Sequence, residues 1–147
     1  LVAGASRQGN GLCVRSFQTA VACLDGLTGR MAWSRPAQGH QGLDGNEQTL
    51  VGVESDGKVL AWQRSTGNPL WTQDALRFRG LSLPLLLNNA VVVGDQEGWV
   101  HFLSAQDGKV LQRVATDGSA ITGKPILAGQ MLVVVTRTGG VFGFRPE

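Results

Sequence analysis

The sequence lacks the long apolar runs, the charge excess and the helical patterns that define several large classes of protein. No stretch approaches the roughly 20 apolar residues that a membrane-spanning helix requires. The net charge is only +2, with both signs scattered along the chain, so no basic surface for nucleic acid is indicated. No segment shows the 3.6-residue periodicity of an amphipathic helix. The chain must therefore be interpreted from its strand pattern.

Residues that could support catalysis or bind a metal are few and poorly spaced. The two histidines, His40 and His101, lie far apart, and neither has a second ligand at metal-binding spacing. Three serines at strand ends or turns lack the context of a nucleophile: Ser16, Ser55 and Ser104. The acidic residues fall at turns, where they bond to local backbone: Asp25, Asp56, Asp95, Glu97 and Asp107. We predict no catalytic residue, no metal site and no cofactor.

What the sequence does contain is one hairpin pattern, repeated four times. Each copy is an apolar run, a short turn and a second apolar run: Leu12–Leu24, Leu50–Trp62, Val91–Leu103 and Leu132–Phe144. The copies start at positions 12, 50, 91 and 132, which are 38, 41 and 41 residues apart. We expect two-residue turns, three of them with glycine at the second position: Gln18-Thr19, Asp56-Gly57, Glu97-Gly98 and Thr138-Gly139. A period near 41 built from strands is typical of a β-propeller blade.

The segments around the hairpins supply the other strands of a four-stranded antiparallel blade. A polar turn ending in glycine follows each of the first three hairpins and leads to a short outer strand: Met31–Ser34, Pro69–Thr72 and Lys109–Arg113. Trp33 and Trp71 lie in these strands, and we expect them to wedge between blades. Inner strands are predicted over Leu81–Leu87 and Ile121–Leu127. The predicted fold is therefore an all-β propeller of four-stranded blades.

The length of the chain fits about four blades, with approximate boundaries at residues 1–38, 39–78, 79–118 and 119–147. Propellers usually close with about four to eight blades. We expect a partial propeller, because Leu1-Val2-Ala3 already falls in an inner strand and the last blade has no outer strand of its own. Uncovered blade faces and an open strand edge favour association, so we expect the isolated chain to self-associate.

The two cysteines are predicted to remain apart. With a two-residue turn at Gln18-Thr19, Cys13 would face Leu24 and Cys23 would face Val14. Alternation along a strand then directs the two thiols to opposite faces of the sheet. A disulfide would need a bulge that shifts the register, so two small buried apolar residues is the favoured interpretation.

The segment Leu24–Trp33 resembles the quinoprotein-like propeller repeat, in which Leu-Asp, Thr-Gly and Trp follow a hairpin in that order. Within that superfamily the chain is similar to the BamB family, the lipoprotein subunits of the outer-membrane β-barrel assembly machinery of Gram-negative bacteria. The similarity rests on three segments: Leu70–Gln73, Val92–His101 and Gly139–Phe144. It extends over the whole chain and matches the C-terminal half of the family.

The resemblance implies a propeller of about eight blades at the periplasmic face of the outer membrane, anchored by lipid on an N-terminal cysteine outside this chain. It implies a non-catalytic scaffold that binds the periplasmic domains of BamA and assists the insertion of unfolded outer-membrane proteins. The alternative is a fragment of a dehydrogenase that binds pyrroloquinoline quinone and calcium. That class usually has adjacent cysteines and axial carboxylates, whereas Cys13 and Cys23 are not adjacent and the inner strands contain Leu83-Pro84-Leu85 and Lys124-Pro125-Ile126.

One connection between blades departs from a small, polar composition. Its bulky residues alternate with arginines at Leu76, Arg77, Phe78 and Arg79. Arginine and phenylalanine are enriched in protein interfaces, so these four residues are candidates for protein binding. The other interpretation is that Leu76 and Phe78 fill the blade junction while the arginines are solvated. The matching connection one blade earlier, His40–Asn46, is polar and glycine-rich, and we expect it to be mobile.

Overall fold

The computed structural model describes residues 4–145, so the expected strand at Leu1-Val2-Ala3 lies outside the described residues. The alternating and continuous apolar runs form antiparallel strands in four sheets, which we number as blades 1 to 4. Blade 1 contains β1 (Ser6–Gln8), β2 (Gly11–Ser16), β3 (Ala20–Asp25) and β4 (Met31–Pro36). Blade 2 contains β5 (Leu43–Gly45), β6 (Thr49–Val53), β7 (Val59–Gln63) and β8 (Pro69–Gln73). Blade 3 contains β9 (Leu85–Leu87), β10 (Ala90–Gly94), β11 (Trp99–Ser104) and β12 (Val110–Ala115), and blade 4 contains β13 (Ile126–Ala128), β14 (Met131–Val135) and β15 (Val141–Phe144).

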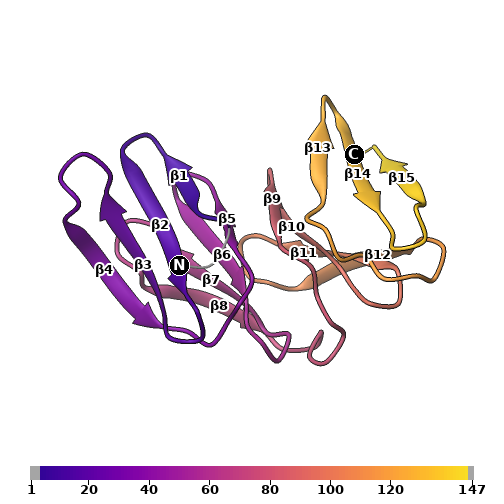
Figure 1. Cartoon of the computed structure of the whole chain (residues 1–147), viewed down its shortest axis with the longest axis horizontal. Coiled ribbons are helices and arrows are strands. Elements are labelled where there is room, and N and C mark those ends of the chain that lie inside the picture. Colours follow the sequence, from indigo (N-terminus) through magenta and orange to yellow (C-terminus); the bar gives the residue numbers. More distant parts are fainter. Residues whose placement is uncertain (1–3, 146–147) are drawn as a thin grey trace.

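The four blades follow one another around an arc, with β1, β5, β9 and β13 on its inner side (Figure 1). No helix occurs between residues 4 and 145, and the predicted all-β propeller fold of antiparallel blades is confirmed. The three outer strands predicted from the sequence are confirmed as β4, β8 and β12.

The inner strands are shorter than predicted. Only the last residues of the two predicted segments pair, as β9 and β13. Pro84 and Pro125 precede these strands, and proline cannot donate to a strand ladder. Leu81 and Ile121 are instead buried among core residues of the neighbouring sheets. The first part of each segment therefore fills the core as irregular chain.

The prediction of two-residue turns is wrong in all four hairpins. Ser16 pairs with Ala20, and the equivalent turns close with hydrogen bonds from Glu54 N to Lys58 O, Asp95 N to Trp99 O and Thr136 N to Gly140 O. Each turn therefore has three residues between its closing pair. Three-residue hairpins commonly place their left-handed residue after a type I turn, as Gly57, Gly98 and Gly139 do here. The extra residue shifts every predicted register by one.

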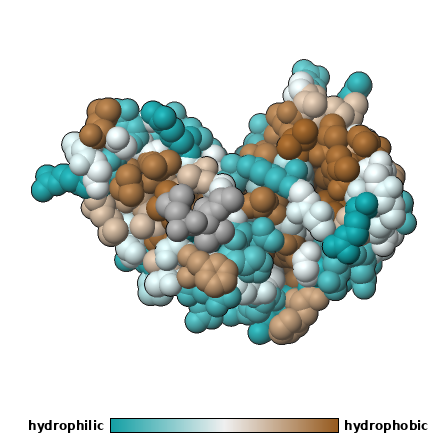
Figure 2. All heavy atoms as spheres, in the orientation of Figure 1, coloured by the Kyte–Doolittle hydropathy of each residue, from teal (hydrophilic) through white to brown (hydrophobic). Residues whose placement is uncertain are grey.

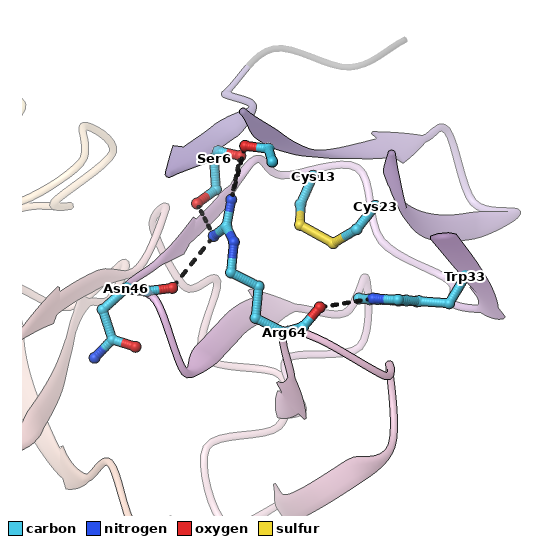
Figure 3. The surroundings of a disulfide bond; sticks show 7 residues. Ser6, Cys13, Cys23, Trp33, Asn46 and Arg64 are labelled. Atoms are coloured by element: carbon cyan, nitrogen blue, oxygen red, sulfur yellow. Dashed lines mark hydrogen bonds between the residues drawn. A yellow bond between two sulfur atoms is a disulfide. The ribbon is translucent and has the colours of Figure 1, made fainter. Parts of the chain in front are cut away.

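This shift overturns the prediction for the cysteines. Cys13 lies directly opposite Cys23, with a Cα–Cα distance of 4.0 Å, and the two form a disulfide (Figure 3). In the first hairpin the left-handed residue is Gln18, with φ of 49°. A non-glycine residue rarely adopts this conformation, so no residue type in this turn indicates a third turn residue. Both cysteines are buried in the core between blades 1 and 2.

The tryptophans wedge between blades as predicted. Trp33 of blade 1 donates from Nε1 to the carbonyl of Arg64, 2.7 Å away in blade 2 (Figure 3). Trp71 of blade 2 donates in the same way to the carbonyl of Ala105 in blade 3, at 2.9 Å. Each indole packs on a left-handed glycine of the next blade, Gly67 or Gly108. The glycine turn between the third and fourth strands of blades 2 and 3, Thr66-Gly67 or Asp107-Gly108, is thus the seat for the tryptophan of the blade before it.

Buried arginines add a second set of links between blades 1 and 2. The Arg64 guanidinium donates to both the hydroxyl and the carbonyl of Ser6, each at 2.8 Å (Figure 3). Arg15 of blade 1 pairs with Glu54 of blade 2 at 3.1 Å. Because burying an unpaired charge is expensive, these pairs favour one relative arrangement of the two blades.

The connection His40–Asn46 is not a loop throughout, so the expectation of a mobile segment is wrong for its second half. Leu43 to Gly45 pair with β6 as the inner strand β5, and Leu43 is buried. Asp44 accepts a hydrogen bond from Leu86 N at 2.7 Å and pairs with Lys124 at 3.3 Å. This inner strand therefore joins blades 2, 3 and 4.

Burial differs between the blades. Val91, Val92 and Val93 of β10 are completely buried, as expected for a strand covered on both faces. Blade 4 instead leaves apolar side chains exposed, and Figure 2 shows hydrophobic surface gathered over this sheet at the upper right. The exposed residues of blade 4 include Ile126, Leu127, Val135 and Val141.

A candidate protein-docking face

The order of the strands brings all the longer connections to one end of the molecule. In an antiparallel blade the β2–β3 type of turn and the link to the next blade lie at the same end. Hydrogen bonds between them recur at a spacing of 41 residues: Ser55 N to Gln38 O, Gln96 N to Arg79 O and Arg137 N to Ala120 O. We name this end, made of the blade connections 37–42, 74–84 and 116–125 and of the turns beside them, the connection end.

A pocket of about 300 Å³ opens at the connection end. It is lined by residues of blades 2, 3 and 4 and of the links between them, among them Val53, Gly57, Phe78, Leu81, Ile121 and Arg137. Both apolar and polar residues line it. Its size and mixed lining suit a side chain of a docked partner better than a large cofactor.

The structure separates the four candidate residues of the connection 74–84 into different environments. Leu76 is buried in the core between blades 2 and 3. Phe78 is 75% exposed and has a left-handed backbone, with φ of 63°. The Arg77 side chain is 42% exposed, and its guanidinium carbon lies 5.1 Å from the centre of the Phe78 ring. Leu76 therefore fills the junction, as one sequence interpretation proposed, while Phe78 is presented to solvent.

Close contact with the neighbouring turn fixes the backbone of this loop. Phe78 N donates to Asp56 O at 2.9 Å, and Arg77 pairs with the Asp56 carboxylate at 3.5 Å. Gly57 allows the approach, because an added Cβ there would lie 2.9 Å from the carbonyl oxygen of Leu76. A left-handed phenylalanine is strained, and such strain is retained where the surroundings hold it in place.

Arg79 reaches inward to a buried acid. Its Nε lies 2.8 Å from Asp95 Oδ2, and the same oxygen lies 2.7 Å from His101 Nε2. Burial alone would raise the pKa of Asp95, but hydrogen bonds from His101, Trp99 N, Arg79 and Glu97 N together lower it below its usual value. Burial lowers the pKa of His101; Asp95 opposes this shift, and the charges of Arg79 and Arg113 add to it. A carboxylate beside a neutral imidazole is therefore the favoured state near neutral pH.

The connection 116–125 is built on a second acid. Asp117 Oδ2 accepts hydrogen bonds from Thr136 Oγ1 at 2.6 Å and Thr138 Oγ1 at 3.0 Å. Bonds from Thr136 and Ser119 lower the pKa of Asp117, so the carboxylate stays charged. These hydrogen bonds join the connection 116–125 to the β14–β15 turn at the connection end.

The histidines and acidic side chains that the structure describes do not gather into a metal site. Within residues 4–145, no three His, Cys, Asp or Glu side chains are grouped as a metal site would require. His40 lies at the connection end with its Nδ1 3.2 Å from Ser55 Oγ, while His101 is buried beneath it. In the same described part of the chain, no helix has the length and apolar character needed to cross a bilayer.

The Asp95–His101 pair is the feature that the sequence reasoning missed. The sequence predicts that Asp95 bonds within a local turn, and two of its bonds are indeed local, from the amides of Glu97 at 2.9 Å and Trp99 at 3.0 Å. The available signal was His101, a titratable residue in the middle of an otherwise apolar strand. Such a residue needs a partner when buried.

Comparison with known proteins gives one consistent result. The family model described as outer membrane protein assembly factor BamB matches residues 1–73. The BamB of Burkholderia pseudomallei is 44% identical over 135 residues, which are 92% of this chain and 35% of that protein. The crystal structure of BamB from Moraxella catarrhalis superimposes with a TM-score of 0.90 at 28% identity, covering 98% of this chain and 43% of that one.

A more distant likeness concerns the fold alone. The quinohemoprotein alcohol dehydrogenase of Comamonas testosteroni superimposes with a TM-score of 0.77 at 15% identity, over 92% of this chain and 29% of that one. The chain spans about a third of the length of the curated relatives it matches.

Proposed function

Because the chain belongs to the BamB family of outer membrane protein assembly factors, we propose that it is part of a non-catalytic scaffold that binds the periplasmic domains of BamA and assists the insertion of outer-membrane proteins. The observation that carries this proposal is the exposed Phe78 on a loop that is fixed at both ends. Leu76 holds one end in the core, and Arg79 holds the other on Asp95.

We define the docking surface as Arg77, Phe78, Arg79 and the pocket beside them. A rigid aromatic ring next to arginine is the composition of an interface hot spot. A loop that is already ordered loses little conformational entropy when it binds. The pocket beside Phe78 would receive a side chain of the partner.

The proposed compartment is the periplasmic side of the outer membrane of a Gram-negative bacterium. Its support is the family of the relatives together with the disulfide Cys13–Cys23. Structural disulfides persist in oxidising compartments, of which the bacterial periplasm is one.

A quinone-dependent dehydrogenase is the weaker candidate. The likeness to such an enzyme is a likeness of fold at 15% identity. The cysteines that it would need side by side are ten residues apart and face each other across a hairpin. No observation favours this activity over the scaffold.

The proposal is tested by titrating the chain with the purified periplasmic domains of BamA in a calorimeter. Phe78→Ala should weaken binding by about 2 kcal/mol without lowering the melting temperature, because the ring makes few contacts within the chain. The matched control is Leu27→Ala. Leu27 is 77% exposed, in the β3–β4 turn at the opposite end, and its replacement should leave the affinity unchanged. Equal affinities for wild type and Phe78→Ala would rule out this docking surface.

A further inference from the structure

Asp95 has more hydrogen-bond partners than its turn requires. More exposed turn acids, such as Asp56 and Asp107, accept a backbone amide with one carboxylate oxygen and keep part of the side chain in solvent. Asp95 is completely buried, and its Oδ1 already accepts two amides, those of Glu97 and Trp99. Its second oxygen, Oδ2, is left over for side chains from elsewhere in the chain. Those side chains are Arg79 and His101.

The main chain of Asp95 makes a further long-range contact. Its carbonyl accepts a hydrogen bond from Ile121 N at 2.9 Å, and Ile121 lines the docking pocket. The next residue, Gln96, donates from N to the carbonyl of Arg79 at 3.0 Å. Residues 95 and 96 therefore bond to the connection 74–84 on one side and to the connection 116–125 on the other.

We propose that Asp95 is the positioning residue of the docking surface. Its buried carboxylate holds Arg79 and so orients Phe78, and its carbonyl holds the opposite wall of the pocket. His101 supplies the second side-chain donor that keeps the carboxylate in place. This inference rests on the proposed function for its binding consequence. It makes a separate claim about the free protein, which is that Asp95 orders the loop 74–80.

The physical reason lies in how the loop is held. Leu76 anchors the loop in the core on the N-terminal side of Phe78, and the next apolar anchor on the other side is Leu81, which follows Gly80 with its positive φ of 63°. Between these two anchors the carbonyl of Arg79 accepts a hydrogen bond from Gln96 N. The side chain of Arg79 adds a charge-assisted hydrogen bond to the buried Asp95 carboxylate, which is the strong kind. Without it, Arg79 would turn to solvent and the strained backbone at Phe78 would relax. The docking surface would then have to be ordered at the moment of binding.

The test uses Asp95→Asn, which keeps the shape of the side chain and removes its charge. Its matched control is Asp107→Asn, the same substitution at an exposed turn at the opposite end, where Asp107 Oδ1 bonds to Lys109 N at 3.1 Å. Two quantities are measured on each folded variant. One is the rate of trypsin cleavage at the Arg79–Gly80 bond relative to the Arg30–Met31 bond, and the other is the affinity for the periplasmic domains of BamA.

We expect Asp95→Asn to raise the relative cleavage rate at Arg79–Gly80 by about tenfold or more, because local opening exposes the bond. We expect it to weaken BamA binding by about tenfold or more as well. Asp107→Asn should change neither quantity. Arg79→Gln breaks the same contact from the partially exposed side, and it should reproduce the loss of affinity even if Asp95→Asn folds poorly.

The outcomes separate the two claims. Unchanged cleavage at Arg79–Gly80 in Asp95→Asn, together with unchanged affinity in both Asp95→Asn and Arg79→Gln, would overturn the positioning role. Faster cleavage at Arg79–Gly80 in a protein whose wild type does not bind BamA would support the role of Asp95 in ordering the loop and would contradict the proposed function instead.

Discussion

At the scale of single residues, buried charged side chains within residues 4–145 link different segments of the chain. Arg64 bonds to Ser6, Arg15 pairs with Glu54, and Asp95 pairs with Arg79 and His101. A buried ion pair adds little net stability compared with a well-packed apolar pair, but breaking one is costly. Such pairs therefore favour one arrangement of the blades and loops over others.

His101 makes this pairing sensitive to pH. Burial lowers its pKa below the ordinary value of 6.5, and Arg79 and Arg113 oppose its protonation while Asp95 favours it. The unfolded chain thus binds a proton more readily than the folded protein. The contribution of His101 to stability is complete above the unfolded pKa, and it is lost as the pH falls from there through the folded pKa.

We therefore expect the free energy of unfolding to fall between about pH 8 and pH 5, and to fall less in His101→Gln, which cannot titrate. Urea unfolding at the two pH values measures this difference. His40→Gln is the control, because His40 is exposed at the same end of the molecule. If His101→Gln lost as much stability as wild type over this range, the titration of His101 would not be the cause.

At the scale of elements, the sequence was sufficient to find the hairpins but not their register. The repeat spacing and the apolar runs located the four pairs of strands, because both properties persist through small changes in a turn. Register depends on a single residue, and Gln18 in a left-handed conformation has no sequence signature. That one residue decided whether Cys13 faces Leu24 or Cys23.

One of the two Thr-Gly turns of the β3–β4 type also seats a tryptophan of the preceding blade, which the sequence predicts only as a wedge between blades. Gly29 and Gly67 have nearly the same positive φ, at 72° and 74°, so alanine is equally strained at both. They differ in their surroundings. Nothing lies within 4 Å of an added Cβ at Gly29, whereas at Gly67 it would lie 2.4 Å from Trp33 Cε3.

Comparing alanine substitutions at Gly29 and Gly67 separates the energy of packing one blade on the next from the energy of backbone strain. Gly29→Ala should cost about 1–2 kcal/mol from backbone strain alone. Gly67→Ala should cost a further 1–3 kcal/mol, roughly, because the tryptophan must move. Chemical denaturation of both variants measures the difference, and equal losses would mean that the indole is not tightly seated on the turn.

At the scale of the whole molecule, the sequence predicted which connection is unusual but not how it is held. The alternation of arginine with bulky residues identified Leu76–Arg79, and the structure assigns Leu76 to the core and exposes Phe78. The support from Asp95 could not be predicted, because the pair joins a turn to a connection 16 residues away. They come together because the connection packs against the β10–β11 turn of blade 3, where Gln96 N donates to the carbonyl of Arg79.

The connection end therefore combines three features: the arginine and phenylalanine residues at 77–79, an ordered loop that presents them, and a pocket beside them. Its links and turns belong to blades that bond to one another at every junction. The opposite end has the short β1–β2 and β3–β4 types of turn, and the β3–β4 type turns of blades 2 and 3 seat Trp33 and Trp71. If the chain is a scaffold, the two ends should behave differently toward a partner.

Hydrogen exchange with and without the periplasmic domains of BamA tests this most directly, because it maps contact on the unmodified chain. We predict that binding slows exchange of backbone amides in 74–80 and 116–125, and leaves the β3–β4 type turns 26–30, 64–68 and 105–109 unchanged. Protection confined to those turns, or no protection anywhere at saturating concentration, would contradict the account.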